Sequence, residues 1–481
     1  MIEPRPFAST KIICTIGPAT AQVDTLVRLI GAGMDVARLN FSHGTHEEHL
    51  ASFRNVREAS RRTGEPVAIL QDLGGPKVRI GRLKNKAVEI RDGQRFIFTV
   101  DDIEGDGTRV STTYQQLPAD VHPGDVILLD DGNLSVRVAS VSAREVECTV
   151  VHGGRLSEHK GMNLPGVRMS VPTLTPKDIE DVRFGLAQGV DYVALSFVRS
   201  AADLRLLRSV MRDSSSSATA PPPIIAKIEK EEAVRDLDSI LEAADGVMVA
   251  RGDLGVEMPP EDVPMVQKLI VRRCNAAGIP VIIATQMLES MIENPRPTRA
   301  EANDVANAVL DGADAVMLSA ETSVGKFPVE TVETMDRIVR TAEATLPTHL
   351  SLEVPVMQSD DQVADAVARS ACMMAERVRA KVIAAVTHSG ATAMRISKYR
   401  PHAMILAFTR DEGVVRRLNL VWGVRGHVVS HPLDDAESIM ERIKGEMVRK
   451  GLAGPGEYAV WTLGLPLLAK GSTNTLKVER F

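Results

Sequence analysis

The chain has 481 residues, of which 44% are hydrophobic, 25% charged and only 3% aromatic, and its net charge is −6. This length predicts two or three domains in a globular protein with a mainly aliphatic core. The negative charge argues against nucleic acid as a main partner, and no apolar run reaches the length of a membrane span.

The cysteines indicate a reducing compartment. Four are present, Cys14, Cys148, Cys274 and Cys372, and no two of them form a CxxC pair. Widely spaced cysteines suggest no disulfide framework, so buried free thiols are expected. A cytoplasmic location fits this pattern.

Short apolar runs alternate with helical stretches along much of the chain. Continuous apolar runs are typical of strands buried on both faces, and eight strand–helix units are the number that closes a (β/α)₈ barrel. Helices are expected at 21–32, 46–62, 264–277 and 298–311, the last with clear start and stop signals. The eight predicted strands are Lys11–Ile16, Asp35–Asn40, Val67–Gln71, Asp191–Phe197, Ile224–Ile228, Gly246–Ala250, Pro280–Ala284 and Asp314–Leu318.

One interval interrupts this alternation. Between Gln71 and about Thr175 the helical pattern disappears, and Gly/Asp turns separate short alternating strands such as Arg95–Val100 and Leu134–Ala139. This pattern predicts an inserted all-β domain. Because it follows the third barrel strand, on the catalytic face, we expect it to act as a lid.

A second α/β unit follows a linker-like stretch at 347–362. We expect an open-sheet domain there, which gives four segments: barrel 1–75, lid 76–171, barrel 172–346 and C-terminal domain 347–481. Its predicted elements are helices Asp361–Val378 and Thr392–Tyr399 and strands Lys381–Val386, Met404–Phe408, Gly426–Val429 and Tyr458–Thr462.

Polar residues gather at the ends of the predicted barrel strands. A lysine beside two carboxylates, Lys227 with Glu229 and Asp253, is what metal-assisted phosphoryl transfer needs. The carboxyl ends of barrel strands converge on one face, so these groups should share one site. Other members of this set are Arg38, Asn40, Ser42, His43, Asp72, Gly252, Thr285, Ser319 and Glu321.

Several motifs carry a resemblance to a known family. They read TKIICTIGPAT (10–20), RLNFSHG (38–44), AKIEK (226–230), MVARGDLGVE (248–257), ATQMLESM (284–291), PTRAEANDVANAVLDGADAVMLSAET (297–322) and NTLKV (474–478). Together they resemble pyruvate kinase from about Thr10 to Val478. The resemblance implies the three-domain plan found above, a homotetramer, and transfer of phosphate from phosphoenolpyruvate to ADP, giving pyruvate and ATP at the last step of glycolysis.

The resemblance also implies residue roles. Glu229 and Asp253 resemble the ligands of the Mg²⁺ that holds phosphoenolpyruvate, with substrate and water oxygens completing the shell. Lys227 would stabilise the phosphoryl group in transit, and Arg38 would grip the phosphate with a bidentate geometry that lysine cannot copy. The backbone N–H groups of Gly252-Asp253 and the hydroxyl of Thr285 would bind the substrate carboxylate.

Nucleotide binding is less sharply marked, because Gly325-Lys326 does not complete a Walker A loop. The resemblance implies that ADP, with a second Mg²⁺, lies between barrel and lid. The proton donor to the enolate stays open between Thr285 and a water near Ser319 and Glu321. The residues implied around the nucleotide are Pro18, Asn40, His43, Arg79 and Lys160.

The histidines at positions 43, 46 and 49 allow a different interpretation. A histidine metal site is conceivable, but catalytic zinc spacings differ. A loop histidine near nucleotide, followed by a solvated helix start, is the simpler interpretation.

One departure from the family pattern concerns potassium. Many pyruvate kinases bind K⁺ beside the phosphate through groups that match Asn40, Ser42, Asp72 and the position of Leu73. Members that need K⁺ usually carry Thr at the Leu73 position and Glu at the Lys77 position. A lysine ammonium at Lys77 could supply the missing charge, so catalysis without K⁺ is predicted; the alternative is a solvent-facing lysine that begins the lid.

A loop in the C-terminal domain favours phosphate binding. Thr387-His388-Ser389-Gly390-Ala391-Thr392 joins a strand to a helix, so hydroxyls, a glycine and free helix N–H groups lie together. The matching loop in many pyruvate kinases binds a phosphorylated effector, and fructose 1,6-bisphosphate, a sugar monophosphate and AMP all remain open. The alternative is an ordinary helix cap.

Two other functions compete. A Mg²⁺-dependent lyase or aldolase acting on a 2-oxo acid would also use Glu229 and Asp253, but it needs neither Lys227 with Arg38 nor a nucleotide lid. A non-enzymatic sensor that binds sugar phosphates would tolerate a degraded active site, yet no expected catalytic residue is missing.

Overall fold

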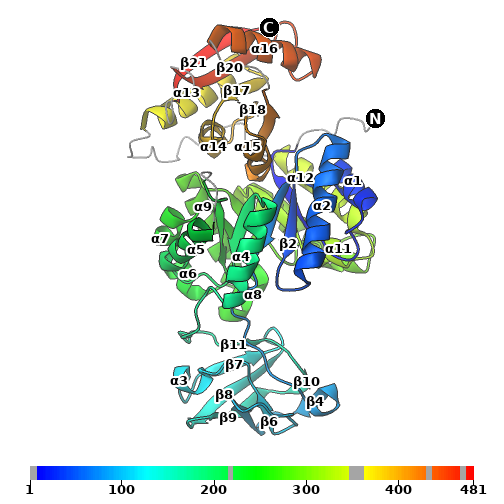
Figure 1. Ribbon diagram of the computed structural model, residues 1–481, viewed down its shortest axis with the longest axis vertical. Helices are drawn as coiled ribbons and strands as arrows, with labels where there is room; N and C mark the ends of the chain where they lie inside the picture. The colour runs from blue at the N-terminus through cyan, green and yellow to red at the C-terminus, as the bar shows by residue number, and fades with distance from the viewer. Residues whose placement is uncertain (1–7, 215–219, 346–361, 430–435, 466–472) are drawn as a thin grey trace.

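The computed structural model describes residues 8–214, 220–345, 362–429, 436–465 and 473–481. The chain forms three bodies stacked along its long axis, with a β domain at one end, a barrel in the middle and an α/β domain at the other end (Figure 1). Among the described residues, no helix combines the length and the apolar character needed to cross a bilayer.

The central body is a closed barrel of eight parallel strands, which confirms the predicted fold class. Each strand lies within two residues of its predicted bounds. Around the barrel the strand order is β1-β16-β15-β14-β13-β12-β3-β2. The strands are β1 (Lys11–Thr15), β2 (Val36–Asn40), β3 (Ala68–Asp72), β12 (Tyr192–Leu195), β13 (Ile224–Ile228), β14 (Gly246–Ala250), β15 (Val281–Ala284) and β16 (Ala315–Leu318).

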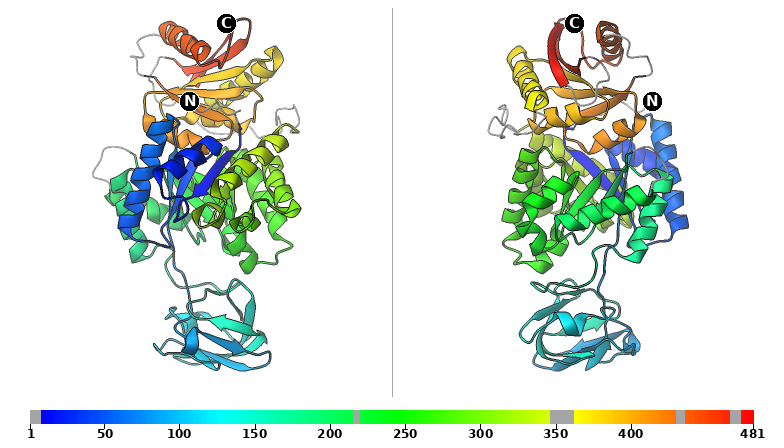
Figure 2. Two further views of the ribbon diagram at one scale, coloured as in Figure 1. Left: turned by 90° about the vertical axis from the view of Figure 1, so that its right-hand side faces the viewer. Right: turned by 60° about the vertical axis from the view of Figure 1, so that its left-hand side comes forward.

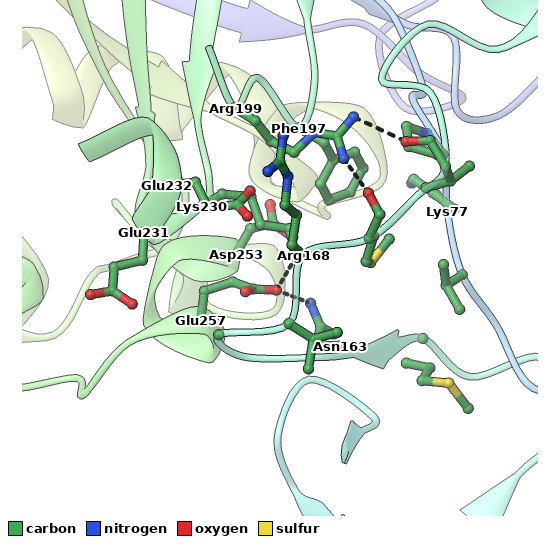
Figure 3. Close-up of a pocket in the computed structure, with 18 of the residues that line it drawn as sticks. Lys77, Asn163, Arg168, Phe197, Arg199, Lys230, Glu231, Glu232, Asp253 and Glu257 are labelled. Atoms are coloured by element: carbon green, nitrogen blue, oxygen red, sulfur yellow. Dashed lines mark hydrogen bonds and ion pairs between the residues drawn. The ribbon is translucent and has the colours of Figure 1, made fainter. Parts of the chain in front are cut away.

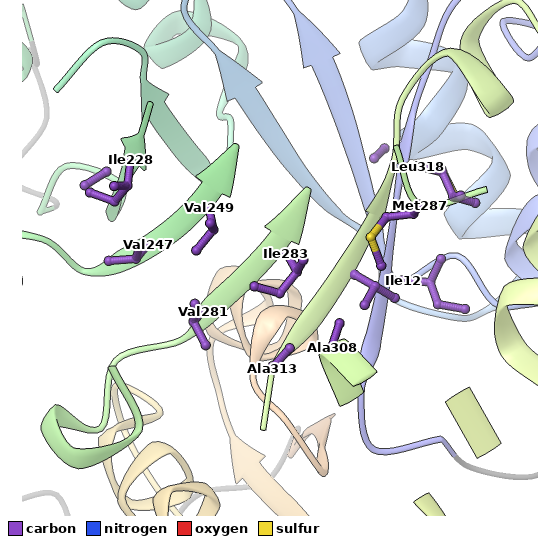
Figure 4. Packing of buried hydrophobic residues seen from close by; sticks show 14 of the residues in the cluster. Ile12, Ile228, Val247, Val249, Val281, Ile283, Met287, Ala308, Ala313 and Leu318 are labelled. Atoms are coloured by element: carbon purple, nitrogen blue, oxygen red, sulfur yellow. The ribbon is translucent and has the colours of Figure 1, made fainter. Parts of the chain in front are cut away.

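Helices surround the barrel and bury its outer face. Alternate strand residues such as Val249 and Ile283 point outward into one cluster with helix residues such as Ala308 (Figure 4). The helices are α1 (Val23–Ala32), α2 (His46–Thr63), α4 (Pro176–Gln188), α5 (Ala201–Ser214), α6 (Glu231–Arg235), α7 (Leu237–Ala243), α8 (Arg251–Glu257), α9 (Val263–Ala277), η2 (Glu289–Ile292), α10 (Arg299–Asp311), α11 (Ala320–Ser323) and α12 (Pro328–Glu343).

Local signals explain where two of these helices begin and end. Thr45 and Thr298 each accept a hydrogen bond from the backbone of the glutamate three residues later, so α2 and α10 start with capping boxes. Both helices end before a glycine with positive φ, Gly64 (72°) and Gly312 (100°). The predicted start and stop of α10 are therefore confirmed.

The lid departs from the barrel after β3 and the chain returns before α4, as Figure 2 shows. Its main sheet has the order β11-β7-β8-β9-β5-β6, and β10 pairs with β4. The insert is a β domain, as predicted, and its connections include two short helical turns, η1 (Lys84–Lys86) and α3 (Leu117–Asp120). The strands are β4 (Ala87–Ile90), β5 (Arg95–Thr99), β6 (Arg109–Ser111), β7 (Val126–Leu129), β8 (Leu134–Val141), β9 (Glu145–His152), β10 (Gly154–Ser157) and β11 (Met162–Asn163).

The C-terminal domain is an open sheet of order β19-β18-β17-β20-β21, in which only β21 is antiparallel. The predicted strand Gly426–Val429 begins two residues earlier, and the predicted start of the first helix, Asp361, lies outside the described residues. We did not predict α16 or β21. The elements are α13 (Gln362–Val378), β17 (Val382–Val386), α14 (Ala391–Lys398), β18 (Met404–Thr409), α15 (Glu412–Arg417), η3 (Leu418–Leu420), β19 (Val424–Val428), α16 (Ala436–Arg449), β20 (Tyr458–Gly464) and β21 (Thr473–Arg480).

The C-terminal domain closes the amino-terminal end of the barrel. The side chain of Leu420 is 1% exposed and joins the cluster of residues that fills the barrel interior. Around it, the Lys11 ammonium donates to the Val424 carbonyl at 2.9 Å, and the Tyr192 hydroxyl donates to the Arg417 carbonyl at 2.7 Å. The opposite end of the barrel, where the strands finish, therefore faces the lid.

Leu420→Ala should destabilise the protein by about 2–5 kcal/mol, because it leaves a void in a packed interior. Leu206 on α5 is 49% exposed, so Leu206→Ala is a matched control with an expected effect within about 0.5 kcal/mol. Denaturant unfolding of the three proteins at one concentration measures the difference. Equal stability of the two variants would show that packing of Leu420 into the barrel interior does not stabilise the protein.

Candidate functional site

A buried ionic network lies at the carboxyl ends of three barrel strands. From β2, the guanidinium Nε of Arg38 donates to Asp72 Oδ2 at 2.7 Å, and its Nη1 donates to Thr15 Oγ1 at 2.9 Å. Asp72 ends β3, and its other oxygen lies 3.2 Å from Lys227 Nζ. Strands far apart in sequence thus bring two cations to one carboxylate, which is 1% exposed.

Lys227 is held from three sides. Its ammonium lies 2.9 Å from Glu229 Oε1 and donates to Ser196 Oγ at 2.7 Å, besides its contact with Asp72. Burial alone would lower the pKa of Lys227, but Asp72 and Glu229 outweigh burial and raise it. The lysine is therefore a fixed positive charge at neutral pH.

The two carboxylates of this network differ in pKa. Burial favours the neutral form of Asp72, but the charges of Lys227 and Arg38 prevail and lower its pKa. Burial raises the pKa of Glu229, and the nearby charge of Asp253 adds to this effect. Glu229 also accepts a 2.7 Å hydrogen bond from the Phe197 backbone N–H. A bound cation would favour the ionised form of this carboxylate.

Ser196 and Phe197 were missed by the sequence analysis, which placed both inside a strand. The strand ends at Leu195, and Phe197 has φ 55°, a conformation that is uncommon for a bulky residue. This turn aims the Phe197 N–H at Glu229, while Ser196 Oγ bridges Lys227 to the Leu73 carbonyl. The polar Ser196, directly after the apolar run of the strand, is the feature of the sequence that indicates a site residue here.

Thr285 and Gly252 contact each other after β15 and β14. The Gly252 N–H, expected to be free for a substrate carboxylate, donates to Thr285 Oγ1 at 2.8 Å. Thr285 has φ 70°, and its carbonyl accepts a 2.7 Å hydrogen bond from Arg251 Nη2. Arg251, which also pairs with Asp304, is a positioning residue that sequence reasoning missed. Asp253 follows in the first turn of α8.

Glu321 lies in α11, the short helix that follows the eighth strand. Its carboxylate accepts hydrogen bonds from the backbone N–H groups of Ser319 (2.7 Å) and Leu288 (3.2 Å). Burial nevertheless raises its pKa above the usual value. A raised pKa extends the pH range in which this carboxyl group carries a proton.

A cavity of about 510 Å³ lies between the barrel and the lid. Figure 3 shows Asp253 and Glu257 on its barrel side with Arg168 beside them, while the Arg199 guanidinium turns to the carbonyls of Met169 and Val171. Lys77 also lines it, and burial there, then the charges of Arg79 and Lys227, lower the pKa of this lysine. The lid thus places cations over the carboxylates of the barrel.

The predicted nucleotide residues divide into two groups. Arg79 and Lys160 line the cavity from the lid, where Lys160 pairs with Asp130 at 2.7 Å. Asn40 ends β2, while Pro18 and His43 lie on the loops after β1 and β2, and none of the three is among the residues that border the cavity. His43 still senses the lid, because burial and then the charges of Lys77 and Arg79 lower its pKa.

Of the three histidines at positions 43, 46 and 49, the side chains of His46 and His49 contact different partners. His46 Nε2 lies 2.7 Å from Asp181 Oδ1, and His49 Nε2 lies 2.9 Å from the His43 carbonyl. The rings of His49 and Phe41 stack at 3.9 Å. In the described part of the chain, no three His, Cys, Asp or Glu side chains come together as a metal cluster. The histidine metal site therefore has no geometric support.

The predicted effector loop joins β17 to α14. Thr387 Oγ1 accepts a 3.0 Å hydrogen bond from the Gly390 N–H, and Gly390 has φ 88°. Thr392, however, turns inward, because its hydroxyl lies 2.7 Å from that of Thr473 in the interior. The hydroxyl of Thr392 is thus engaged within the protein, while His388 and Ser389 form the exposed part of the loop.

Comparisons with known proteins agree along nearly the whole chain. The family model described as pyruvate kinase, barrel domain, matches residues 7–332, and that for the pyruvate kinase alpha/beta domain matches residues 365–479. A pyruvate kinase of Corynebacterium glutamicum is 48% identical over 98% of this chain and 97% of its own length. One from Geobacillus stearothermophilus is 47% identical over 98% and 80%, respectively.

A solved structure gives the same result for the fold. The crystal structure of a pyruvate kinase from Cryptosporidium parvum superposes with a TM-score of 0.92 at 40% sequence identity. The match covers 98% of this chain and 96% of that one.

Proposed function

Because this chain belongs to the pyruvate kinase family and is thus a phosphotransferase, we propose that it transfers phosphate from phosphoenolpyruvate to ADP with Mg²⁺ at Glu229 and Asp253. The buried network of Arg38, Asp72, Lys227 and Glu229 is the observation that carries this proposal. Two cations held at the carboxyl ends of the strands offer fixed positive charge where a transferred phosphoryl group develops negative charge.

Arg38 and Lys227 have separate tasks. Arg38 uses Nε and Nη1 within the protein, and none of the described residues accepts from its Nη2, which can donate to a phosphate oxygen. The Lys227 ammonium is oriented by Ser196 and Asp72, so its charge needs little reorganisation during the transfer.

The donor set suits Mg²⁺. Glu229 and Asp253 supply carboxylate oxygens, and the charge of Asp253 acts on Glu229. Because the described residues offer no third acidic ligand there, substrate and water oxygens would complete the shell, as Mg²⁺ prefers. When bound, Mg²⁺ would supply positive charge for the phosphoryl and enolate oxygens.

For protonation of the enolate, the contacts favour a water held near Ser319 and Glu321 over Thr285. The Thr285 hydroxyl already donates to the Ala284 carbonyl at 2.6 Å and accepts from the Gly252 N–H. Burial raises the pKa of Glu321, which favours this carboxyl group as a source of the proton for such a water. Thr285 then acts by shaping the loop that receives the substrate carboxylate.

A coupled pyruvate assay tests the proposal. With phosphoenolpyruvate, ADP and Mg²⁺ we expect pyruvate and ATP in equal amounts, and excess EDTA should abolish both. A lyase or aldolase would release pyruvate without ADP, so pyruvate formation that does not depend on ADP would reject the proposal. Failure to form pyruvate under any condition would support the non-enzymatic sensor.

The sheet topology of the C-terminal domain supports an effector site at Thr387–Thr392. The strand order runs outward from β17 through β18 to β19 and then returns to β20 on the other side of β17. Ligands of open α/β sheets bind outside the carboxyl ends of strands at such a reversal. We expect a phosphorylated metabolite there to change the KM for phosphoenolpyruvate, and an unchanged KM with every sugar phosphate and AMP would reject this role.

Exposed apolar side chains support a homotetramer. They gather on α9, where Met265 is 63% exposed, and on α13, where Val363 is 63% exposed. Two such faces on different domains can build two interfaces. Sedimentation of a monomer at working concentration would contradict this assembly.

The cores and the thiols support the remaining expectations. The buried cluster of the lid and the main cluster of the C-terminal sheet contain no barrel residue, which supports the boundaries at 75/76, 171/172 and 346/347, although Leu420 packs into the barrel interior. All four cysteines are free and buried, as a reducing cytoplasmic compartment would favour. Fractionation of the native cells would test the location, and an extracellular protein would contradict it.

A further inference from the structure

The turn Ser196–Arg199 lies where both connections of the lid meet the barrel. It follows β12, and the side chain of Val198 is fully buried in the core cluster around the barrel. Phe197 and Arg199 also line the cavity between barrel and lid (Figure 3). The turn contacts both the departing segment of the lid (residues 73–76) and its returning segment (residues 169–173).

Arg199 ties the returning segment to the barrel. Its Nη1 donates to the Met169 carbonyl at 2.6 Å, and its Nη2 donates to the Val171 carbonyl and to Thr173 Oγ1, each at 3.0 Å. The side chains of Met169 and Val171 pack against the core of the lid, so Arg199 holds the backbone of residues that belong to the lid. A planar guanidinium can bind several acceptors at once, which a lysine ammonium copies only in part.

The ring of Phe197 lies against the departing segment. Gly75 has φ 65°, and a Cβ atom at this position would lie 2.7 Å from Phe197 Cδ2, which is too close for any side chain. The Gly75 N–H donates to Asp178 Oδ1 at 3.1 Å, and the Leu73 carbonyl accepts from Ser196 Oγ at 2.7 Å. These contacts join the departing segment to the same turn.

The turn also holds the proposed metal ligand Glu229. The Phe197 N–H donates to Glu229 Oε2 at 2.7 Å, while Glu229 Oε1 lies 2.9 Å from the Lys227 ammonium. Phe197 makes this contact with φ 55°, a conformation that a bulky residue keeps only where its surroundings impose it. The contacts of Arg199 with the returning segment and of Gly75 with the Phe197 ring are constraints of this kind.

We infer that Arg199 is a positioning residue, which fixes the Ser196–Arg199 turn against the lid and thereby orients the Glu229 carboxylate for its metal ion. This inference rests on the proposed Mg²⁺ site at Glu229 and Asp253. Loss of a hydrogen-bond partner of a metal ligand typically weakens metal binding by about 10–100-fold. Here the partner is a backbone N–H, so its direction depends on the turn, and the turn depends on Arg199.

The sign of the effect separates positioning from charge. Arg199 is a cation that lines the same cavity as Asp253. If only its charge mattered, its removal would strengthen the binding of a divalent cation. Loss of positioning should instead weaken that binding. Arg199→Met removes the charge and the donors together, so the two explanations predict opposite changes in affinity.

Binding of Mn²⁺ to the full-length protein, followed by electron paramagnetic resonance, tests the inference. Mn²⁺ takes the same carboxylate and water oxygens as Mg²⁺. We expect Arg199→Met to raise the Kd at least about tenfold, and Arg199→Lys to lie between that variant and the wild type. Arg205 on α5 is exposed, so Arg205→Met is the matched control and should bind like the wild type. An unchanged or lower Kd in a folded Arg199→Met protein would overturn the inference.

Trypsin cleavage gives a second readout that needs no metal. Arg168 is exposed and directly precedes the returning segment. Arg199→Met removes the hydrogen bonds to the carbonyls of Met169 and Val171, so cleavage after Arg168 should become about tenfold faster. Mass spectrometry of the fragment that ends at Arg168 gives the rate. An unchanged rate would show that Arg199 does not tie the returning segment to the barrel.

A glycine variant tests the turn if Arg199→Met does not fold. Gly75→Ala places a Cβ against the Phe197 ring and changes no charge, so it should also weaken Mn²⁺ binding. Gly64→Ala is its matched control, because Gly64 has φ 72° and no described residue beyond its chain neighbours lies within 4 Å of its Cβ position. Equal Mn²⁺ affinity in the two glycine variants would contradict the inference. Failure of the wild type itself to bind Mn²⁺ or to form pyruvate would instead reject the proposed function, and the inference with it.

Discussion

Replacing Lys227 with methionine should lower kcat for pyruvate formation by about 10³-fold while the KM for phosphoenolpyruvate changes little. The ammonium is fixed by Ser196, Asp72 and Glu229 before any substrate arrives, so most of its effect belongs to the transition state. Methionine keeps the unbranched chain as far as Cε and removes the ammonium with its charge and donors. Steady-state kinetics with saturating ADP and Mg²⁺ measures the split between kcat and KM.

Two control measurements are needed to assign the loss of kcat to the missing ammonium of Lys227. Loss of the ammonium leaves Asp72 and Glu229 buried with less compensation, so thermal unfolding of Lys227→Met must show that the fold persists. Lys268 on α9 is 42% exposed, and Lys268→Met is the control that should retain full kcat. A variant that stays folded and loses affinity for phosphoenolpyruvate, with kcat intact, would assign Lys227 to ground-state binding instead.

The wild-type enzyme should keep its kcat when tetramethylammonium replaces K⁺. The Lys77→Glu variant should lose activity by about 10–100-fold unless K⁺ is added, because a carboxylate then replaces a fixed positive charge. The charge of Lys77 is felt at Asp72, Asp253, Lys227 and His43. This distribution of charge motivates the prediction that Lys77 replaces a monovalent cation. Rates in K⁺, Na⁺ and tetramethylammonium give the readout.

The surroundings of Leu73 support the prediction that the Lys77 ammonium replaces K⁺. Its side chain is 1% exposed and offers no oxygen, and its carbonyl already accepts from Ser196 Oγ. Lys84→Glu in the lid makes the same charge reversal outside the cavity, so it should remain independent of K⁺. A wild-type enzyme that loses most of its kcat without K⁺ would show that Lys77 does not take this role.

The strands of the barrel could be predicted because each is a continuous apolar run buried on both faces. Ile224–Ile228 and Gly246–Ala250 agree with the prediction at both ends. β21 and α16 could not be predicted with the same ease. β21 has mostly partly buried residues with an exposed one at every third position, which does not match strand alternation, and α16 is amphipathic, so both depend on packing against the sheet.

The membership of the candidate site could likewise be predicted from polar residues after barrel strands. The contacts among them could not. Asp72 lies 155 residues before Lys227, and their 3.2 Å ion pair exists only because β3 and β13 both lie next to β12. Ser196, Phe197 and Arg251 act through turns and hydrogen bonds that no local pattern reveals.

Sequence by itself determined the family, the eight barrel strands and the residues that carry charge to their ends, because these follow from local apolar runs and motifs. Only the tertiary structure decided how those charges are used. It pairs the Lys227 ammonium with the Glu229 carboxylate and hydrogen-bonds the Gly252 N–H to Thr285. It also packs Leu420 into the interior of the barrel. The strength of these contacts depends on burial and on interatomic distance. Both are set by segments that meet only in the folded chain.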